Sequence, residues 1–208
     1  MKIITTLERK TTFTEIKKAL SNGTARELFG GAGSISVEVE GIGTAIFDII
    51  GYDSEKLAGK DKKHSMTLWM RDLLFDEMAF DEEGSNRWEN SSIRKYINSK
   101  AFIERFEPGF RKLLSPVYKK NDDRADTKDT FFLLSKEELE GGYEFFKTER
   151  DRVKVNKKGE TDWHWTRSAG RGGAGNPWYV GTSGYVNYSN AIWARRFSPA
   201  CVISAVCI

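Results

Sequence analysis

Few side chains near the end of this sequence could carry out catalysis or bind a metal. One histidine, His164, lies four residues before Ser168, and no carboxylate follows Asp162. A nucleophilic serine needs a base that is itself oriented by a third group, and a metal site needs several Cys, His or acidic ligands. Neither set is present. We therefore expect no catalytic residues, no metal ligands and no cofactor, and a protein that is not an enzyme.

The two cysteines, Cys201 and Cys207, lie six residues apart in the strand-like run FSPACVISAVCI. At about 3.3 Å per residue they would share one face of a strand at a separation of roughly 20 Å. They cannot form a disulfide with each other there, and two cysteines are too few for a disulfide scaffold. We expect both to be small buried core residues.

Four aspartates, at 122, 123, 126 and 129, lie in the charged run KKNDDRADTKDT (119–130). A calcium loop of the EF-hand type needs a glycine at its sixth position and a bidentate glutamate at its twelfth. Neither residue is present in register, so this run is predicted to be a solvated loop.

Length and charge limit the class of protein. The chain has 208 residues and a net charge of +3, which fits one domain with small additions and gives no reason to expect a nucleic-acid partner. No apolar run approaches the roughly 18 residues of a membrane span. The first residues, MKIITTLERKTTF, are interrupted by Glu8 and Arg9, so we expect no secretory signal. A cytoplasmic protein, or one exported by another route, is expected.

The charge distribution changes abruptly at Trp163. From there to Ile208 the chain has no Lys, Asp or Glu, and its charged side chains are four arginines. Four of the six tryptophans lie in this segment, together with tyrosine, asparagine, serine and glycine. Tyr and Trp give large contact areas at low entropic cost, and Arg gives forked donors. This composition favours a recognition surface.

The elements that must position this surface follow from hydrophobic periodicity and turn residues. The stretch 65–75 fits either a strand or a helix. The expected elements are a helix over 12–29 interrupted at Asn22-Gly23, a hairpin of 34–40 with 44–53, a helix over 93–106 ended by Pro108-Gly109, a strand over 131–135, a strand over 163–168, a hairpin over 179–187 and a closing strand over 197–208 with Pro199 at an edge or bulge. Their irregular order predicts an α+β fold.

The C-terminal segment contains the pattern W-x-R-S … V-x-x-x-G-x-V-N … N-A … P-A, formed by Trp165, Arg167, Ser168, Val180, Gly184, Val186, Asn187, Asn190-Ala191 and Pro199-Ala200. Before it in the chain lie RWENSSIRKYIN (87–98) and FFLLSKEEL (131–139). The pattern resembles the variable region of target proteins of diversity-generating retroelements, which are common in phages and prophages. The two earlier stretches resemble the conserved frame of a bacterial domain family with the same fold as those target proteins.

The resemblance implies a C-type-lectin-like fold with short antiparallel strands and a few flanking helices. It implies an N-terminal helical segment at 1–33, then a domain over 34–208 whose ligand-binding region is about 163–208. In such proteins, errors at template adenines diversify Asn codons, and Lys and Glu cannot arise. Trp178 and Trp193 cannot arise in this way either, and they join the candidates from the same loops. The candidate ligand-binding residues are Arg171, Gly172, Gly173, Trp178, Tyr179, Tyr185, Asn187, Tyr188, Asn190, Ile192, Trp193, Arg195 and Arg196.

The function implied by the resemblance is non-enzymatic binding of a protein or glycan on a cell surface, by a cytoplasmic or virion-associated protein that could form a homo-oligomer. Two alternatives stay open. One is a catalyst like the formylglycine-generating enzymes, which share the fold class and use a C-terminal cysteine pair. The other is a prophage-encoded structural or tail-associated protein without diversification. Within the segment, three tryptophans are expected in the core: Trp163, Trp165 and Trp178.

Overall fold

The computed structural model describes residues 11–59, 62–122 and 124–206. Its elements include both α-helices and strands, with short 3-10 and π turns between them. In chain order they are α1 (Phe13–Asn22), α2 (Ala25–Phe29), β1 (Ser34–Val39), β2 (Gly43–Tyr52), β3 (Lys62–Met70), β4 (Met78–Ala79), η1 (Trp88–Asn90), α3 (Ser92–Ile97), α4 (Lys100–Glu104), α5 (Pro108–Arg111), β5 (Val117–Asn121), β6 (Arg124–Asp129), β7 (Phe131–Phe132), η2 (Glu138–Gly142), η3 (Glu149–Arg152), β8 (Lys154–Val155), β9 (Thr161–Asp162), β10 (His164–Ala169), β11 (Pro177–Val180), β12 (Val186–Tyr188), β13 (Ala194–Arg195) and β14 (Ala200–Val206).

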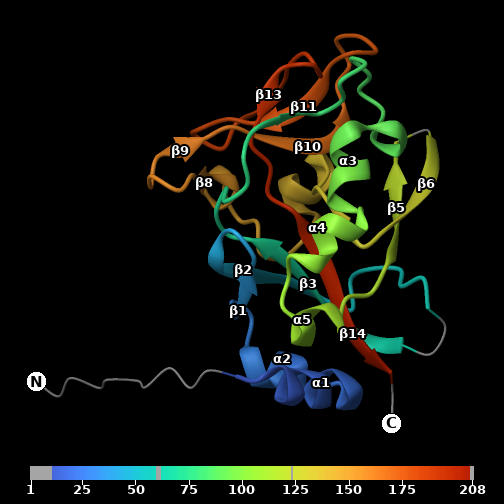
Figure 1. Ribbon diagram of the computed structural model, residues 1–208, viewed down its shortest axis with the longest axis vertical. Coiled ribbons are helices and arrows are strands. Elements are labelled where there is room, and N and C mark those ends of the chain that lie inside the picture. The colour runs from blue at the N-terminus through green and yellow to red at the C-terminus, as the bar shows by residue number, and fades with distance from the viewer. Residues whose placement is uncertain (1–10, 60–61, 123, 207–208) are drawn as a thin grey trace, which may run out of the picture.

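The largest sheet has five strands in the order β1-β2-β3-β14-β7, and every neighbouring pair is antiparallel. The hairpin expected from alternation at 34–40 is confirmed, with Val37 opposite Ala45. Of the ambiguous stretch 65–75, the residues up to Met70 continue β3 as a strand. Strand β14 lies between β3 and β7 and runs from the middle of the molecule towards its lower end (Figure 1). The C-terminal strand is therefore an interior strand of the sheet, not an edge strand.

Helices α1 and α2 cover the end of the molecule farthest from the small strands β10, β11 and β13 (Figure 1). The α1 helix begins at a capping box formed by Thr12 and Glu15, and it ends at Gly23, which has a left-handed φ of 73°. Its buried face, which includes Leu20, packs against β14 and β3. The interruption expected at Asn22-Gly23 is present.

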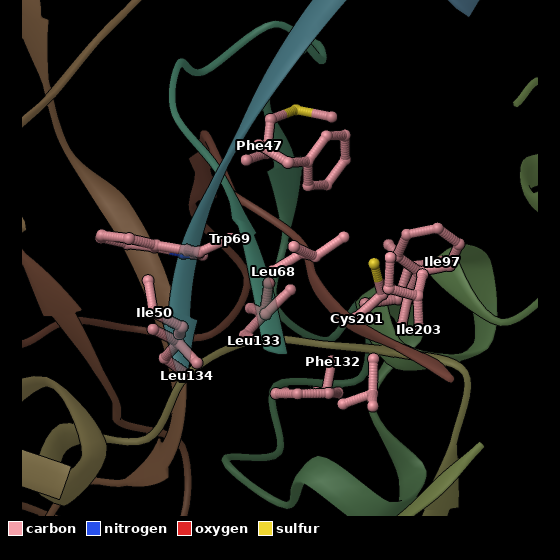
Figure 2. Close-up of a cluster of buried hydrophobic side chains, with 14 of the residues drawn as sticks. Phe47, Ile50, Leu68, Trp69, Ile97, Phe132, Leu133, Leu134, Cys201 and Ile203 are labelled. Carbon is pink, nitrogen blue, oxygen red and sulfur yellow. The ribbon is translucent and has the colours of Figure 1, made fainter. Parts of the chain in front are cut away.

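One hydrophobic core joins the large sheet to the helices and to the small strands. Figure 2 shows part of it, where Trp69, Phe132 and Cys201 approach from three different strands of the sheet. Phe102, Phe106 and other aromatic rings fill the side under α4 and α5, at centroid separations of about 5–6 Å. The same core continues upward to Trp165.

A second group of strands lies at the other end of the molecule and presents the C-terminal loops. Strands β10, β11 and β12 form an antiparallel three-stranded sheet, and β13 pairs with β4. The hairpin expected within 179–187 is present as β11 and β12, with Tyr179 opposite Asn187. The sequence therefore predicted the pairing that positions the candidate surface.

The single helix expected over 93–106 is wrong: the chain breaks it into α3 and α4. Asn98 causes the break, because its side chain donates to the carbonyls of Arg94 and Phe131 and accepts from the N–H groups of Thr130 and Phe131. Ser99 then caps α4 by accepting from the Phe102 N–H. The expected stop at Pro108 is the first residue of the short helix α5.

The loop expected over 119–130 is also wrong, because this run forms the antiparallel hairpin β5–β6. Its charges are partly buried and paired. Lys119 lies between the carboxylates of Glu55 and Glu138, at 2.8 and 2.7 Å. Asp129 accepts from the Trp88 indole at 3.0 Å. Ion pairs across the fold therefore let a charged sequence form strands.

The architecture is α+β, with mostly antiparallel strands and a few short helices, as the sequence predicts. In the part of the chain that the structure describes, no helix is both long and apolar enough to cross a bilayer. Pro199 precedes β14, and its carbonyl accepts from the Met70 N–H at 3.1 Å. Although β14 lies inside the sheet, the proline at its start removes no ladder hydrogen bond.

Candidate recognition surface

The frame of the candidate surface is strand β10, which is buried on both faces from His164 to Ser168. Trp165 is 1% exposed and donates its indole N–H to the carbonyl of Met78 at 3.2 Å. It also packs edge-on to Phe80 at 5.9 Å. The tryptophan therefore ties β10 to β4 and to the chain that follows it. Trp163 and Trp178 are only partly buried.

Arg167 anchors the same strand through a buried ion pair with Glu138. Burial alone would raise the pKa of Glu138, but the Arg167 guanidinium and the Lys119 ammonium lower it to about 2. Lys119 also pairs with Glu55, which accepts a hydrogen bond from the Tyr143 hydroxyl. A largely buried charge network therefore holds β10 against β5 and η2.

The loop between β10 and β11, residues 170–176, is fixed by hydrogen bonds from Asn86. The Asn86 amide donates to the carbonyls of Gly170 and Gly173 at 3.3 and 3.0 Å, and its backbone N–H donates to Ala174. Asn86 is 3% exposed. One buried amide therefore sets the path of this glycine-rich loop.

The loop between β12 and β13 is held by the chain around Asp81. The Asp81 N–H donates to the Ala191 carbonyl at 3.2 Å, and the Ala191 N–H donates to Gly175 at 2.8 Å. The Asp81 carboxylate organises its own turn by accepting from the N–H groups of Glu83 and Ser85. Residues 81–86 therefore support both loops of the candidate surface.

Eight of the thirteen candidate residues are open to solvent, six of them in these two loops and two, Asn187 and Tyr188, in β12. Tyr188, Ile192 and Trp193 are 45%, 53% and 55% exposed, values that are high for large apolar side chains. The exposed members of the predicted set are Arg171, Gly172, Gly173, Asn187, Tyr188, Asn190, Ile192 and Trp193. The structure thus brings the predicted aromatic and polar groups to one end of the molecule.

Tyr179 was expected on the surface, and its burial contradicts that expectation. It is 5% exposed, and its ring stacks on Trp163 at 4.8 Å with an interplanar angle of 7°. Burial, with a hydrogen bond to Tyr185, raises the pKa of the Tyr179 hydroxyl to about 12. Both Tyr179 and its neighbour Val180 in β11 are buried, and Tyr179 packs on Trp163 and Trp165. It belongs to the frame.

Two further candidates, Tyr185 and Arg195, are half-buried. The Tyr185 ring lies over Gly181, where an added Cβ would come within 2.3 Å of the ring. The Arg195 guanidinium lies 4.6 Å from the Trp163 ring centroid and 5.7 Å from that of Trp193. These residues connect the frame to the exposed set.

Arg196 is also half-buried, and its guanidinium N–H groups already bond to other residues of the fold. Its Nε donates to Asp162 at 2.8 Å and its Nη1 to the Phe75 carbonyl at 3.0 Å. It also pairs with Glu77 at 3.7 Å. A side chain fixed in this way orients the segment before β14 and has little freedom to meet a ligand.

Gly172 and Gly173 are exposed but constrained. A Cβ at Gly172 would come within 2.6 Å of the Tyr188 ring, so that ring packs over the glycine. Gly173 has a φ of 139°, which side-chain-bearing residues rarely adopt. Both glycines shape the loop, so their own contribution to a ligand contact is through the backbone.

An open groove of about 770 Å³ lies beside this loop. Its one wall is formed by Arg171, Trp178 and Tyr188, all from the predicted set. Trp178 and Tyr188 are opposite each other in β11 and β12, and their rings meet edge to face at 5.5 Å. Half-buried Trp178 thus reaches solvent through this groove.

The opposite wall was missed by the sequence analysis. It comes from the turn between β5 and β6 and from the chain before η2, through Asp122, Arg124, Lys136 and Glu137. No local pattern marks these residues, because they lie 34 to 66 positions before the aromatic wall. The Arg167–Glu138 ion pair, which joins β10 to η2, helps to bring the two walls together. So do hydrogen bonds from the Ala169 N–H to Asp122 and from the Ser168 hydroxyl to Glu137.

Two reactive side chains, His164 and Lys154, are buried away from the groove. His164 is 2% exposed, and burial with the nearby Lys154 lowers its pKa to about 4. Lys154 is also buried and donates to the Met70 and Arg71 carbonyls. Across residues 11–59, 62–122 and 124–206, no three His, Cys, Asp or Glu side chains gather as ligands for a metal ion.

Cys201 lies in the middle of β14, opposite Leu68 of β3 and Phe131 of β7. It is fully buried, and burial raises the pKa of its thiol. Figure 2 shows it beside Ile97 and Ile203. It has the place of a small core residue, as expected, and Cys207 lies outside the described residues.

Comparison with known proteins gives one match. No curated protein sequence and no solved structure matches the chain. The model of one family, described as a domain of unknown function (DUF6273), matches residues 64–205. That span begins in β3 and ends within β14, so it contains the frame, both loops and both walls of the groove. The chain belongs to the DUF6273 family.

Proposed function

We propose that this chain is a ligand-binding protein without catalytic activity, built on a C-type-lectin-like fold, and that a retroelement diversifies its C-terminal region, about residues 163–208. The observation that carries the proposal is the division of this region into two sets. Framework residues such as Trp165 and Arg167 are buried and bonded. Tyr188, at the end of β12, and Ile192 and Trp193, in the loop after it, are exposed.

This division is what diversification requires of a scaffold. Residues that change between copies must not support the fold, because most substitutions in a packed core are destabilising. Asn190 and Ile192 lie in a loop whose backbone is held by Asp81, and Arg171 lies in one held by Asn86. Both supporting residues come from outside the diversified segment. Substitutions at the exposed positions would therefore leave the loop paths in place.

The chemistry of the exposed set favours a protein or glycan ligand on a cell surface. Large aromatic side chains that stay exposed are typical of binding surfaces, where they supply most of the affinity. The arginine and asparagine side chains beside them give directional hydrogen bonds. The antiparallel sheet closed by β14 and flanked by short helices is compatible with the proposed lectin-like fold.

The nucleotide sequence of the encoding locus tests the diversification. We expect a near-copy of the segment for residues 163–208 beside a reverse transcriptase gene, with differences concentrated at adenines of the copy. Differences should fall on codons for exposed residues such as Tyr188 and Ile192, and spare those for Trp165 and Arg167. A locus that lacks the copy and the reverse transcriptase would refute diversification.

Ligand binding has its own test, with a matched control. A double variant, Ile192→Ser with Trp193→Ser, should lose at least tenfold in affinity for whichever purified surface protein or glycan binds the wild-type chain. Leu28→Ser removes an equally exposed apolar side chain from α2, at the far end of the molecule. Equal affinities of the double variant and the wild type would exclude these loops as the binding site.

A further inference from the structure

The groove beside the C-terminal loops has two walls of different origin. Arg171, Trp178 and Tyr188 come from the region proposed to vary, whereas Asp122 and Arg124 come from the β5–β6 turn outside it. We propose that this groove binds a saccharide that bears a carboxylate, such as a uronic or sialic acid. The inference rests on the proposed function, because it names the ligand class of one part of the same surface.

The size and shape of the groove fit a short oligosaccharide. A volume of about 770 Å³ lies within the range of roughly 300–1,000 Å³ found for small-ligand sites. Trp178 and Tyr188, whose rings meet at an angle of 83°, give it an apolar corner. Lys136 lies 5.5 Å from the Trp178 ring and adds a cation beside that corner. A pyranose ring has an apolar C–H face that packs on aromatic rings and hydroxyls that point outward.

The unused hydrogen-bonding groups point to a ligand with a negative charge. Arg171 is exposed, and among the described residues it makes no hydrogen bond or ion pair. Arg124 makes one long hydrogen bond, of 3.5 Å, to the Asn86 side-chain oxygen. A guanidinium matches the planar, forked geometry of a carboxylate. The two arginines therefore leave most of their donors for the ligand.

The two carboxylates of the groove distinguish a sugar from a more highly charged ligand. Asp122 accepts from the Ala169 N–H at 3.4 Å, and Glu137 accepts from the Ser168 hydroxyl at 3.1 Å. Each carboxylate keeps lone pairs that can accept a hydrogen bond from a sugar hydroxyl. A phosphate dianion would be repelled by both carboxylates. Lys136 is paired with Glu140, which leaves two guanidinium groups and two carboxylates in the groove. This set suits a ligand with a single negative charge and several hydroxyls.

The test uses matched pairs of sugars and the full chain. The probes are a hyaluronan hexasaccharide against chitohexaose, and sialyllactose against lactose, each titrated by isothermal calorimetry. At least one acidic sugar should bind ten times or more tightly than its neutral partner. If both members of each pair bind equally, or no acidic sugar binds at all, the proposal is overturned.

Variants then place the bound sugar in the groove. Arg171→Ser should weaken binding of the acidic sugar at least tenfold and leave that of the neutral sugar unchanged, and Trp178→Ala should weaken both. Arg150→Ser is the control, because it removes an exposed arginine from η3 outside the groove. Unfolding curves confirm that each variant folds. Unchanged affinity in Arg171→Ser would overturn the proposal.

The outcome separates this inference from the proposed function. A chain that ignores every acidic sugar but binds a protein through Trp193 would retain the recognition function and lose the saccharide site. Conversely, an acidic sugar that depends on Arg171, in a chain whose locus has no template copy, would retain the saccharide site and refute diversification. The two results are read from different experiments.

Discussion

Trp163 and Tyr179 stack face to face, with ring centroids 4.8 Å apart and an interplanar angle of 7°, and the Arg195 guanidinium lies 4.6 Å from the Trp163 ring. This stack joins Trp163, the residue directly before β10, to Tyr179 of β11. It also makes Tyr179 a frame residue in the middle of a segment whose other tyrosines face solvent or are half-buried.

Replacing Tyr179 should therefore destabilise the fold. Tyr179→Ala removes a 5% exposed ring from contact with Trp163 and Trp165, and we expect a loss of about 3 kcal/mol in the free energy of unfolding, measured in urea. Tyr188→Ala, at a 45% exposed position in the same hairpin, should cost well under 1 kcal/mol. Equal losses would show that Tyr179 is not a frame residue.

The tyrosines of this hairpin illustrate how far the sequence could predict the site. Alternation predicted the β1–β2 hairpin correctly because that strand is buried on one face only, and turn residues predicted β11 and β12. In β10 both faces are buried, so alternation there says nothing about which side meets the ligand. Tyr179 is buried because it stacks on Trp163, and Tyr188 lies over Gly172 at the surface. Both contacts form only when the chain folds, so the sequence does not show which tyrosine is exposed.

The Arg167–Glu138 pair should make the free energy of unfolding depend on pH in the acidic range. The pKa of Glu138 is about 2 in the folded chain and about 4.5 in the unfolded one, so its contribution is present above pH 4.5 and is lost as the pH falls towards 2. Unfolding free energies measured in urea between pH 7 and pH 2.5 should show this loss. Glu138→Gln should remove about 3 kcal/mol at pH 7, because Arg167 is left buried without its partner.

His164 contributes a separate acid effect that the same measurement must distinguish. Its pKa is lowered to about 4 from 6.5, so that contribution is present above pH 6.5 and is lost as the pH falls through 4. Glu138→Gln should retain this upper part of the curve and lose the lower part. A variant curve parallel to that of the wild type below pH 4.5 would contradict the assignment to Glu138.

Asn86 should control the recognition loop without touching a ligand. Asn86→Ala removes the donors to the Gly170 and Gly173 carbonyls, and we expect a loss of about 2 kcal/mol in the free energy of unfolding. The segment 170–176 should also become the first site of cleavage in limited proteolysis, identified by mass spectrometry. Asn190→Ala changes an exposed asparagine of the neighbouring loop and should leave both measurements near wild-type values.

Gly172 should show that the glycine-rich loop restricts which substitutions the surface tolerates. A Cβ there would come within 2.6 Å of the Tyr188 ring, an exposed side chain that can rotate away. Gly172→Ala should therefore change stability by less than about 1 kcal/mol while moving Tyr188 away from the loop, which weakens its ring contact with Trp178 in NMR spectra. Gly173→Ala places a side chain at a φ of 139°, so it should cost about 1–2 kcal/mol. A Gly172→Ala spectrum with Tyr188 in place would contradict the close packing of that ring, and natural copies with side chains at 173 would contradict the backbone constraint.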